Sequence, residues 1–331
     1  MASLSAPSRR QPARAAFGAA AAVLLLALPF VLGEGYELHL LIVAAIFTML
    51  ASSLSLVVGH AGLLSLGHAA FFGIGAYASA LLFLRLGVPM WGGIIGAGLG
   101  SALAAYLVGA LVLRVRGNRF IITTVAFAEI TRIVVLNAVG LTRGQMGLPG
   151  IAAPIVSIPG IGTIDFGHKT AFYYVALAGA ALCVWTVARI VRSPIGWGLA
   201  ALRENESLGE SVGVSAFRHA MIAFVVGACF AGIAGSLYAH YLNFVSPDLF
   251  LFSYTTTMLV MVVIGGKASI LGPVLGAVLF TLVAEYLRAI DQYRLVILGA
   301  VLLIAVLALP KGLADLGTRL AQRPLASRRS R

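Results

Sequence analysis

The sequence predicts an all-α polytopic membrane protein with about ten transmembrane helices, within a range of roughly eight to ten. Of its 331 residues, 60% are hydrophobic and only 10% are charged, whereas soluble globular chains carry about 25% charged residues. Apolar runs near the length that crosses a bilayer recur from end to end. The 38 glycines suit close helix packing in lipid. The runs are apolar on all sides, which excludes the alternating pattern of β-barrel strands.

Ten candidate spans follow from these runs. The first follows three arginines and is similar to a signal peptide, but "LPFVLGEGYE" lacks a small-x-small cleavage site, so we interpret it as a retained helix. Two assignments are weak: 59–68 fits a buried non-helical turn equally well, and 253–265 is short for a crossing. The spans are 17–33, 39–58, 68–84, 91–113, 119–140, 170–191, 218–241, 253–265, 271–288 and 294–309.

Positive charge lies in short clusters beside the apolar runs, as in "RVRGNR" (114–119). Such clusters are typical of cytoplasmic loops and predict that both termini are cytoplasmic. Ten spans then place the loop 192–218 inside, and the proline- and glycine-rich loop 142–169 outside. The predicted organisation is a basic N-terminal tail at 1–16, a transmembrane domain at 17–310 and a basic C-terminal tail at 311–331.

Three functional classes receive little support. The net charge of +12 has no basic stripe with interleaved aromatic residues, so we expect lipid rather than nucleic acid as a partner. Cys183 and Cys229 lie in apolar runs without metal-ligand spacing, which predicts packing residues and no metal site. "IGGKAS" (264–269) resembles a phosphate loop, but Met261 stands where the motif needs Gly, and Ala268 replaces Ser or Thr.

The stretch "GHAGLLSLGHAAFFGIGAY" (59–77) is the first candidate site. Its glycines permit a tight bend and close packing. Bent backbone inside a membrane can also line a substrate path, as in transporters with discontinuous helices. A Ser/His hydrolase is a third interpretation, although no acidic residue lies nearby in sequence to orient a histidine. The candidate residues are His60, Gly62, Ser65, Gly67 and His68.

Ionisable residues inside the spans are costly and therefore informative. Glu129 and Arg132 stand three residues apart in one span, and Glu285 and Arg288 repeat that spacing in another. Each pair can meet on one helix face. In one interpretation, the two charges of each pair only neutralise each other. In the other, Glu129 lies at the substrate pathway or at a contact with a partner subunit.

The stretch "RENESLGESVGV" (203–214) gathers three of the eleven acidic residues of the chain, Glu204, Glu206 and Glu210. Ser193–Pro194 ends the preceding span. "GLAALRENESLG" (198–209) predicts a single short amphipathic helix, which glycines break before the next span. Acidic residues oppose the positive-inside preference, so their position indicates a protein partner. The leucines near one side of this helix are Leu199, Leu202 and Leu208, and the breaking glycines are Gly209 and Gly213.

Taken together, four blocks resemble the permease subunits of branched-chain amino-acid ABC importers, most closely the LivM type. The resemblance covers about residues 40–310. The blocks are "LSLVVGHAGLLSLGHAAFFGIGAYASALL" (54–82), "RGNRFIITTVAFAEITRIVVLN" (116–137), "SPIGWGLAALRENE" (193–206, continued by "VGVS") and "FAGIAGSLYAHYLNFVSPDLFLFS" (230–253, followed by "MVVIGG").

The resemblance implies a non-catalytic permease subunit in a bacterial inner membrane that translocates branched-chain or related hydrophobic amino acids. It implies a second, homologous permease, two cytoplasmic ABC ATPase subunits and a periplasmic amino-acid-binding protein. ATP and magnesium then bind the ATPases, and this chain binds no cofactor. The acidic loop corresponds to the coupling helix that fits a groove on the ATPase. The implied coupling residues are Arg203, Glu204, Asn205, Glu206, Leu208, Gly209 and Gly213.

Some residues depart from the family pattern. His60 stands where an aromatic residue is common, "RGQMGLPG" (143–150) replaces an Asn-Gly-type turn, and "GGKAS" (265–269) replaces a glycine-rich sequence. Two other functions therefore stay open at this point. One is the permease of a urea or short-chain amide importer, which shares much of this pattern. The other is a stand-alone secondary transporter, which should carry more ionisable groups inside the membrane and no docking helix.

Overall fold

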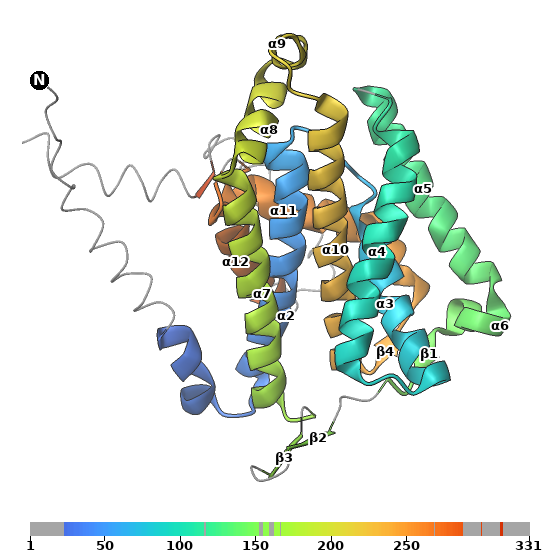
Figure 1. Cartoon of the computed structure of the whole chain (residues 1–331). Helices are drawn as coiled ribbons and strands as arrows, with labels where there is room; N and C mark the ends of the chain where they lie inside the picture. Colours follow the sequence, from blue (N-terminus) through green and yellow to red (C-terminus); the bar gives the residue numbers. More distant parts are fainter. Residues whose placement is uncertain are drawn as a thin grey trace, which may run out of the picture.

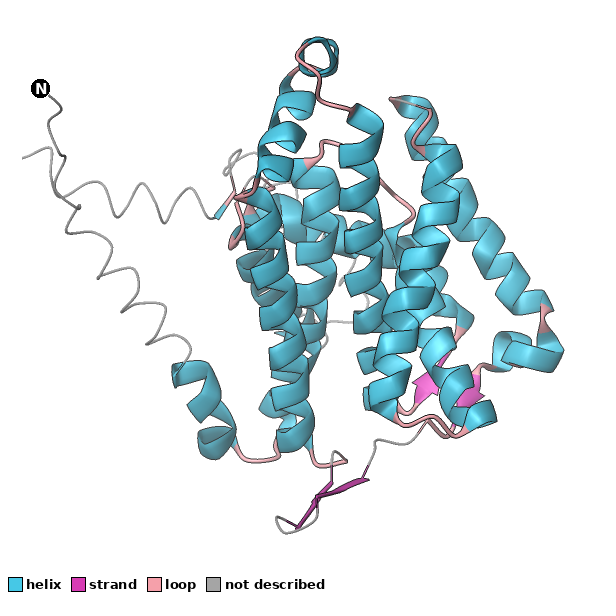
Figure 2. Cartoon of the chain, in the orientation of Figure 1, coloured by secondary structure: helices cyan, strands magenta, loops and turns pink. Residues whose placement is uncertain are grey.

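The chain forms a bundle of helices that run mostly between two ends (Figure 1). The strands lie toward one end, which we call the hairpin end (Figure 2). The opposite end carries α9 (Glu206–Ser211), and we call it the α9 end. The computed structural model describes residues 23–115, 117–151, 155–158, 162–165, 167–267, 269–286, 299, 312 and 313.

Six helices in the described part are long and apolar enough to cross a membrane. Each begins and ends within about three residues of the ends of a predicted span. The agreement is expected, because the length of an apolar run sets the length of a helix that crosses the hydrocarbon. The six are α2 (Tyr36–Ser55), which a π-helical turn η1 (Leu56–His60) extends, α3 (His68–Leu86), α4 (Met90–Val112), α5 (Asn118–Asn137), α7 (Lys169–Val191) and α10 (Ala216–Leu242).

The expected count of about ten spans is not confirmed. The described residues give six long helices and three shorter apolar ones, Val23–Leu32, α11 (Phe252–Gly265) and α12 (Gly272–Tyr286). At 1.5 Å per residue, a 14-residue helix such as α11 extends only about 21 Å, less than the roughly 30 Å of hydrocarbon. The predicted span 294–309 and the tail 1–16 lie outside the described residues, as does the tail 311–331 except for residues 312 and 313.

Helix α10 forms the centre of the bundle and packs against α2, α3 and α4. Glycines let α3 and α10 approach closely: a methyl group on Gly75 would overlap the backbone of Gly232. A methyl group on Gly235 would likewise overlap the carbonyl oxygen of Phe72. Small residues at such crossings are what permit helices to associate in lipid, where no hydrophobic force brings them together.

The outer helices present apolar side chains to their surroundings. Along α4 an exposed stripe recurs every four residues, which places it on one helix face. Its members are between 59% and 66% exposed, a surface that suits lipid or another apolar partner rather than water. They are Ile95, Leu99, Leu103 and Leu107.

The predicted outer loop 142–169 contains secondary structure that an all-α assignment missed. Strand β1 (Leu148–Pro149) pairs antiparallel with β4 (Phe244–Val245), which follows α10. Strand β2 (Ile155–Ile158) forms a hairpin with β3 (Gly162–Asp165). Strands of two to four residues carry too little alternation to stand out in a segment rich in Pro and Gly. The remaining short helices are α6 (Val139–Thr142), η2 (Gly144–Met146), α8 (Pro194–Glu204) and η3 (Pro247–Phe250).

The two cysteines are packing residues, as predicted. Cys183 is buried and its thiol donates to the carbonyl oxygen of Met49 at 3.6 Å. Cys229 is partly buried, and both thiols are free. Among the described residues, no three His, Cys, Asp or Glu side chains are grouped as metal ligands.

Candidate functional site

The loop between α7 and α10 folds into two short helices rather than the single predicted one. After α7 ends, Ser193 adopts extended backbone and Pro194 occupies the first turn of α8, where a missing N–H costs nothing. Asn205, also extended, separates α8 from α9. Its side-chain oxygen accepts a hydrogen bond from the backbone N–H of Leu208 at 3.1 Å. Because this N-cap satisfies a donor that would otherwise be orphaned, the chain starts a new helix instead of continuing the first.

The two glycines of this loop have different roles. Gly209 lies inside α9, where it is buried, so the prediction that it breaks the helix is wrong. A methyl group there would stand 3.0 Å from Cδ2 of Leu202, so a small residue lets α9 pack onto α8. Gly213 follows α9 with φ of +88°, a backbone conformation that favours glycine, and its predicted role as a break is confirmed.

Helices α8 and α9 expose a mixed surface at the tip of the α9 end (Figure 1). The Glu204 side chain is 77% exposed. Leu208 is 64% exposed and Val212 is 72% exposed. Exposed leucine and valine beside a carboxylate form the kind of surface that a protein partner covers, with an apolar centre and a polar rim.

Arg203, by contrast, turns back toward the bundle. Its Nη1 donates to the carbonyl oxygen of Gly59 at 2.9 Å, and its Nη2 donates to Glu204 at 3.1 Å. The carbonyl of Gly59 belongs to the last turn of its helix, whose carbonyls lack donors within the helix. Arg203 therefore caps the α2–η1 helix from a residue 144 positions away in sequence.

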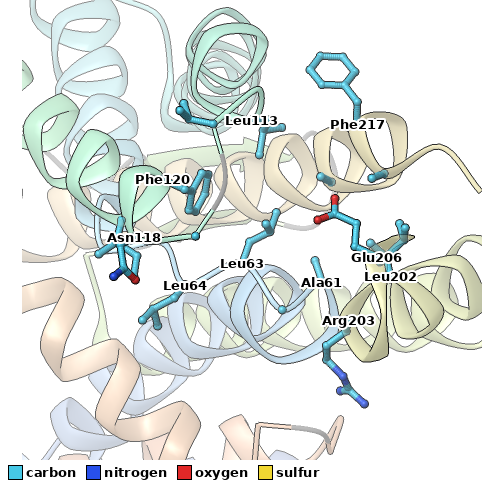
Figure 3. Close-up of a pocket in the computed structure, with 17 residues that line it drawn as sticks. Ala61, Leu63, Leu64, Leu113, Asn118, Phe120, Leu202, Arg203, Glu206 and Phe217 are labelled. Carbon is cyan, nitrogen blue, oxygen red and sulfur yellow. The ribbon is translucent and has the colours of Figure 1, made fainter. Parts of the chain in front are cut away.

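A hollow of about 270 Å³ lies beside this contact. Segment 61–64, the turn between α4 and α5, helices α8 and α9, and the first turns of α10 line it. The carboxylate of Glu206 points into the hollow (Figure 3). The predicted coupling segment and the predicted bend thus share one cavity, although they are far apart in sequence.

The segment 61–67 is not helical and connects η1 to α3, so the predicted non-helical turn at 59–68 is confirmed except at its ends, which lie in η1 and α3. The turn is not fully buried, because Gly62 and Leu64 are exposed. Gly62 has φ of +72° and packs against the side chain of Arg203. A methyl group on Gly67 would overlap the carbonyl oxygen of Thr124 on α5. The two glycines are required by geometry, one by its backbone conformation and the other by the space available.

The two histidines of the bend are buried and do not engage Ser65. His68 Nε2 lies 2.9 Å from the hydroxyl of Ser53 on α2. Within the described part of the chain, the Ser65 hydroxyl and His60 Nε2 have no hydrogen-bond partner. A serine nucleophile needs a base within about 3.2 Å, so this arrangement gives no geometric support to the hydrolase interpretation.

Glu129 and Arg132 form the expected pair on α5. Arg132 Nε lies 3.1 Å and 3.0 Å from the two carboxylate oxygens of Glu129. The Glu129 side chain is 49% exposed, so the pair faces outward from this chain. In α12, Glu285 accepts a hydrogen bond from the Tyr36 hydroxyl, and Arg288, its predicted partner, lies outside the described residues.

The sequence analysis placed Gly59 in the bend but missed that its carbonyl accepts from Arg203, and it missed Thr124, which contacts the bend at Leu66 and Gly67. Both act through contacts between segments far apart in sequence. Periodicity and local motifs report contacts along one element and give no signal for such pairs.

Comparisons with known proteins agree on one family. A family model described as the permease component of branched-chain amino acid transport systems matches residues 37–306. The LivM permease protein of Salmonella typhimurium is 36% identical over 314 residues, which cover 88% of this chain and 72% of that protein. The LivM protein of Escherichia coli is 35% identical over 309 residues, with the same coverage. The LivH permease protein of Escherichia coli is 23% identical over 81% of this chain and 90% of that protein. No solved structure gives a significant match.

Proposed function

The chain belongs to the family of permease components of branched-chain amino acid transport systems, and from that premise we propose that it is the membrane subunit through which an ABC importer moves branched-chain or related hydrophobic amino acids. It is a multi-pass membrane protein, and no catalytic role is assigned to it. The relatives at 36% and 23% identity are named as two different permeases, LivM and LivH, which supports pairing with a second, homologous permease.

The observation that carries this proposal is the α8–α9 segment, which projects from one end of the bundle with exposed Glu204 and Leu208. We propose a cytoplasmic ATPase subunit as the partner of this surface. It would bind ATP and magnesium, and a periplasmic binding protein would deliver the amino acid at the hairpin end. The expected mechanism is alternating access, in which ATP-driven movement of α8–α9 opens the pathway first to one side and then to the other.

Charge supports this orientation in the bacterial inner membrane. The loops, short helices and helix termini at the α9 end carry a series of arginines, as the positive-inside preference requires of the cytoplasmic side. These arginines are Arg114, Arg119, Arg192, Arg203 and Arg218.

A purification in mild detergent tests the proposed function. A tagged copy of the chain, expressed with its genomic neighbours, should retain two ATPase subunits and a second permease, identified by mass spectrometry. Gradient-driven flux through vesicles that contain this chain alone would instead support a stand-alone secondary transporter. Ligand binding by the co-encoded binding protein separates an amino acid importer from a urea or amide importer.

The Glu129–Arg132 pair is proposed to line the pathway, where its two charges would meet the carboxylate and ammonium groups of a passing amino acid. A charge pair exposed on a membrane helix is costly against lipid, so something polar is expected beside it. The bend residues His60, Gly62, Ser65, Gly67 and His68 are proposed to bound the same pathway toward the α9 end.

Exchanging the two charges (Glu129→Arg with Arg132→Glu) tests this role. The exchanged pair still neutralises itself at the same spacing, so the amount of folded protein should stay close to normal. Uptake should fall by about tenfold or more, because the charges then face the substrate in the wrong order. Reconstituted uptake measures the effect, and Arg132→Leu, which leaves an unpaired carboxylate, should lower the amount of folded protein. Normal uptake by the exchanged variant would show that the pair only neutralises itself.

A further inference from the structure

We propose that Arg203 and Thr124 are positioning residues that transmit movement of α8–α9 to α5 through residues 59–67, which we call the bend segment. The bend segment is held at one end by α8 and at the other by α5. It starts in the last two residues of η1 and is non-helical from residue 61 to residue 67. This inference rests on the proposed function, since it assumes that a partner moves α8–α9.

The first contact is the hydrogen bond from Arg203 to the carbonyl oxygen of Gly59, at 2.9 Å. The Arg203 stem also packs against Gly62, so one side chain holds the bend segment at two points. A guanidinium with several donors on a partly buried stem is suited to such a fixed contact. When α8 moves, Gly59 and Gly62 must move with it or the hydrogen bond must break.

Gly59 has no room to yield on its other side. A methyl group there would overlap the carbonyl oxygen of Lys267, in the turn between α11 and α12. Gly59 is therefore enclosed between the guanidinium of α8 and the backbone of that turn. Tightly packed contacts pass on a displacement rather than absorbing it, because packed interiors have two arrangements rather than a continuous range.

The backbone of the bend segment can change its conformation. Its first two residues close the π-helical turn η1, and such turns are common at functional sites. Within it, the N–H of Leu63 donates to the carbonyl of Val57 at 3.0 Å, and the N–H of Ser65 donates to that of Leu63 at 2.8 Å. These local hydrogen bonds keep the segment compact, while its non-helical backbone leaves it free of the rigid ladder that holds α2 and α3.

The second contact joins the bend segment to α5. The N–H of Leu66 donates to the hydroxyl of Thr124 at 3.2 Å, and Thr124 is only 2% exposed. The same hydroxyl donates to the carbonyl of Ile121 at 2.8 Å, which turns its lone pairs toward Leu66. Gly67 lies against the carbonyl of Thr124, so the two backbones are in direct contact.

Of the long helices, α5 is the one best able to move when the bend segment is displaced. Of the six, it has the lowest buried share, 17% against 78% for Tyr36–His60. It contacts mainly α3 and η3 and stands apart from the centre of the bundle (Figure 1). It also carries Glu129 and Arg132, so a shift at Thr124 would displace the charge pair that we place at the pathway. A helix with few buried contacts costs less to move than a core helix.

Adjacent threonines on α5 provide a matched test. Thr124→Val removes the acceptor for Leu66 while keeping the shape of the side chain. Thr123→Val is the control, because the Thr123 hydroxyl donates to the carbonyl of Arg119 on its own helix, at 2.7 Å. The full transporter in proteoliposomes, with its ATPases and loaded binding protein, is assayed for uptake per ATP hydrolysed. Thr124→Val should lower this ratio about fivefold, and Thr123→Val should leave it unchanged.

Arg203 is tested in the same assay. Arg203→Met should lower uptake per ATP by a similar factor, and Arg203→Lys should restore part of it. If the two residues act in series, uptake per ATP in the double variant Arg203→Met with Thr124→Val should be no lower than in either single variant. If the two changes were independent structural defects, their effects would add and the double variant would have the lowest uptake per ATP. Should Thr124→Val fail to assemble, Thr124→Ser, which keeps the hydroxyl, should couple normally and Thr124→Ala should not.

Two outcomes separate this inference from the proposed function. If the Arg203→Met and Thr124→Val variants take up as much substrate per ATP hydrolysed as the wild type, only the transmission role is overturned. A wild-type chain that never retains an ATPase would overturn the proposed function itself.

Discussion

Replacing Gly235 with alanine is expected to remove most of the folded protein from the membrane. The added methyl group would overlap the carbonyl oxygen of Phe72 and lie 2.8 Å from the backbone nitrogen of Ala76. Backbone atoms of α3 cannot turn aside as a flexible side chain can, so α3 and α10 must separate along their whole contact. Overpacking of this kind costs roughly 1–3 kcal/mol and sometimes more. The measurement is the thermal stability of the detergent-solubilised protein, followed by the fraction that stays monodisperse.

Gly100→Ala is the matched control for this change. A methyl group at Gly100 would stand 3.9 Å from Cβ of Ala78, an ordinary contact. Alanine also favours a helix by up to about 1 kcal/mol over glycine, so this variant should be as stable as the wild type or slightly more so. Equal stability of the Gly235→Ala and Gly100→Ala proteins would contradict the close approach of α3 and α10.

The double change Glu204→Ala with Glu206→Ala is expected to uncouple transport from ATP hydrolysis. Glu204 is exposed at the tip of the α9 end, and Glu206 points into the hollow beside it. Truncating charges that pair across an interface costs about 2–5 kcal/mol per buried pair, so ATPase docking should weaken by at least about tenfold. Uptake and binding-protein-stimulated ATPase activity in proteoliposomes give the readout.

Glu210→Ala is the control within the same loop. It removes one acidic charge from α9 but lies outside the hollow, so uptake should change by less than about twofold. The coupling role of Glu204 and Glu206 is wrong if the double variant retains normal uptake and normal stimulated ATPase activity.

The positions of the long helices were predicted well from the sequence, because the thickness of the hydrocarbon sets both the length of an apolar run and the length of a membrane helix. The 218–241 run, for example, became α10 with only a few added residues at its ends. The number of crossings was harder to predict. A run such as 253–265 is apolar enough for a span, yet its helix is too short to cross alone.

The α8–α9 segment shows where local signals were present but misinterpreted. Asn205 followed by Glu206 is a favourable start for a helix, and the structure uses it as one. The sequence analysis placed both residues inside a longer helix, since the leucine spacing on either side is helical. The hydrogen bond from Arg203 to Gly59 could not have been predicted in this way, because it joins positions 144 residues apart and depends on how α8 packs onto η1.

The pairing of β1 with β4 fixes the end of α10 at the hairpin end of the bundle. Leu148 pairs with Val245, just after α10 ends, while α9 leads into the start of α10 only a few residues before Ala216. Helix α10 contains no proline and, at 27 residues, is about 40 Å long. A single unbroken helix therefore joins the α9 end to the strand pair at the hairpin end. Under the proposed function, a partner that docks at the hairpin end would act on the α9 end through this one helix.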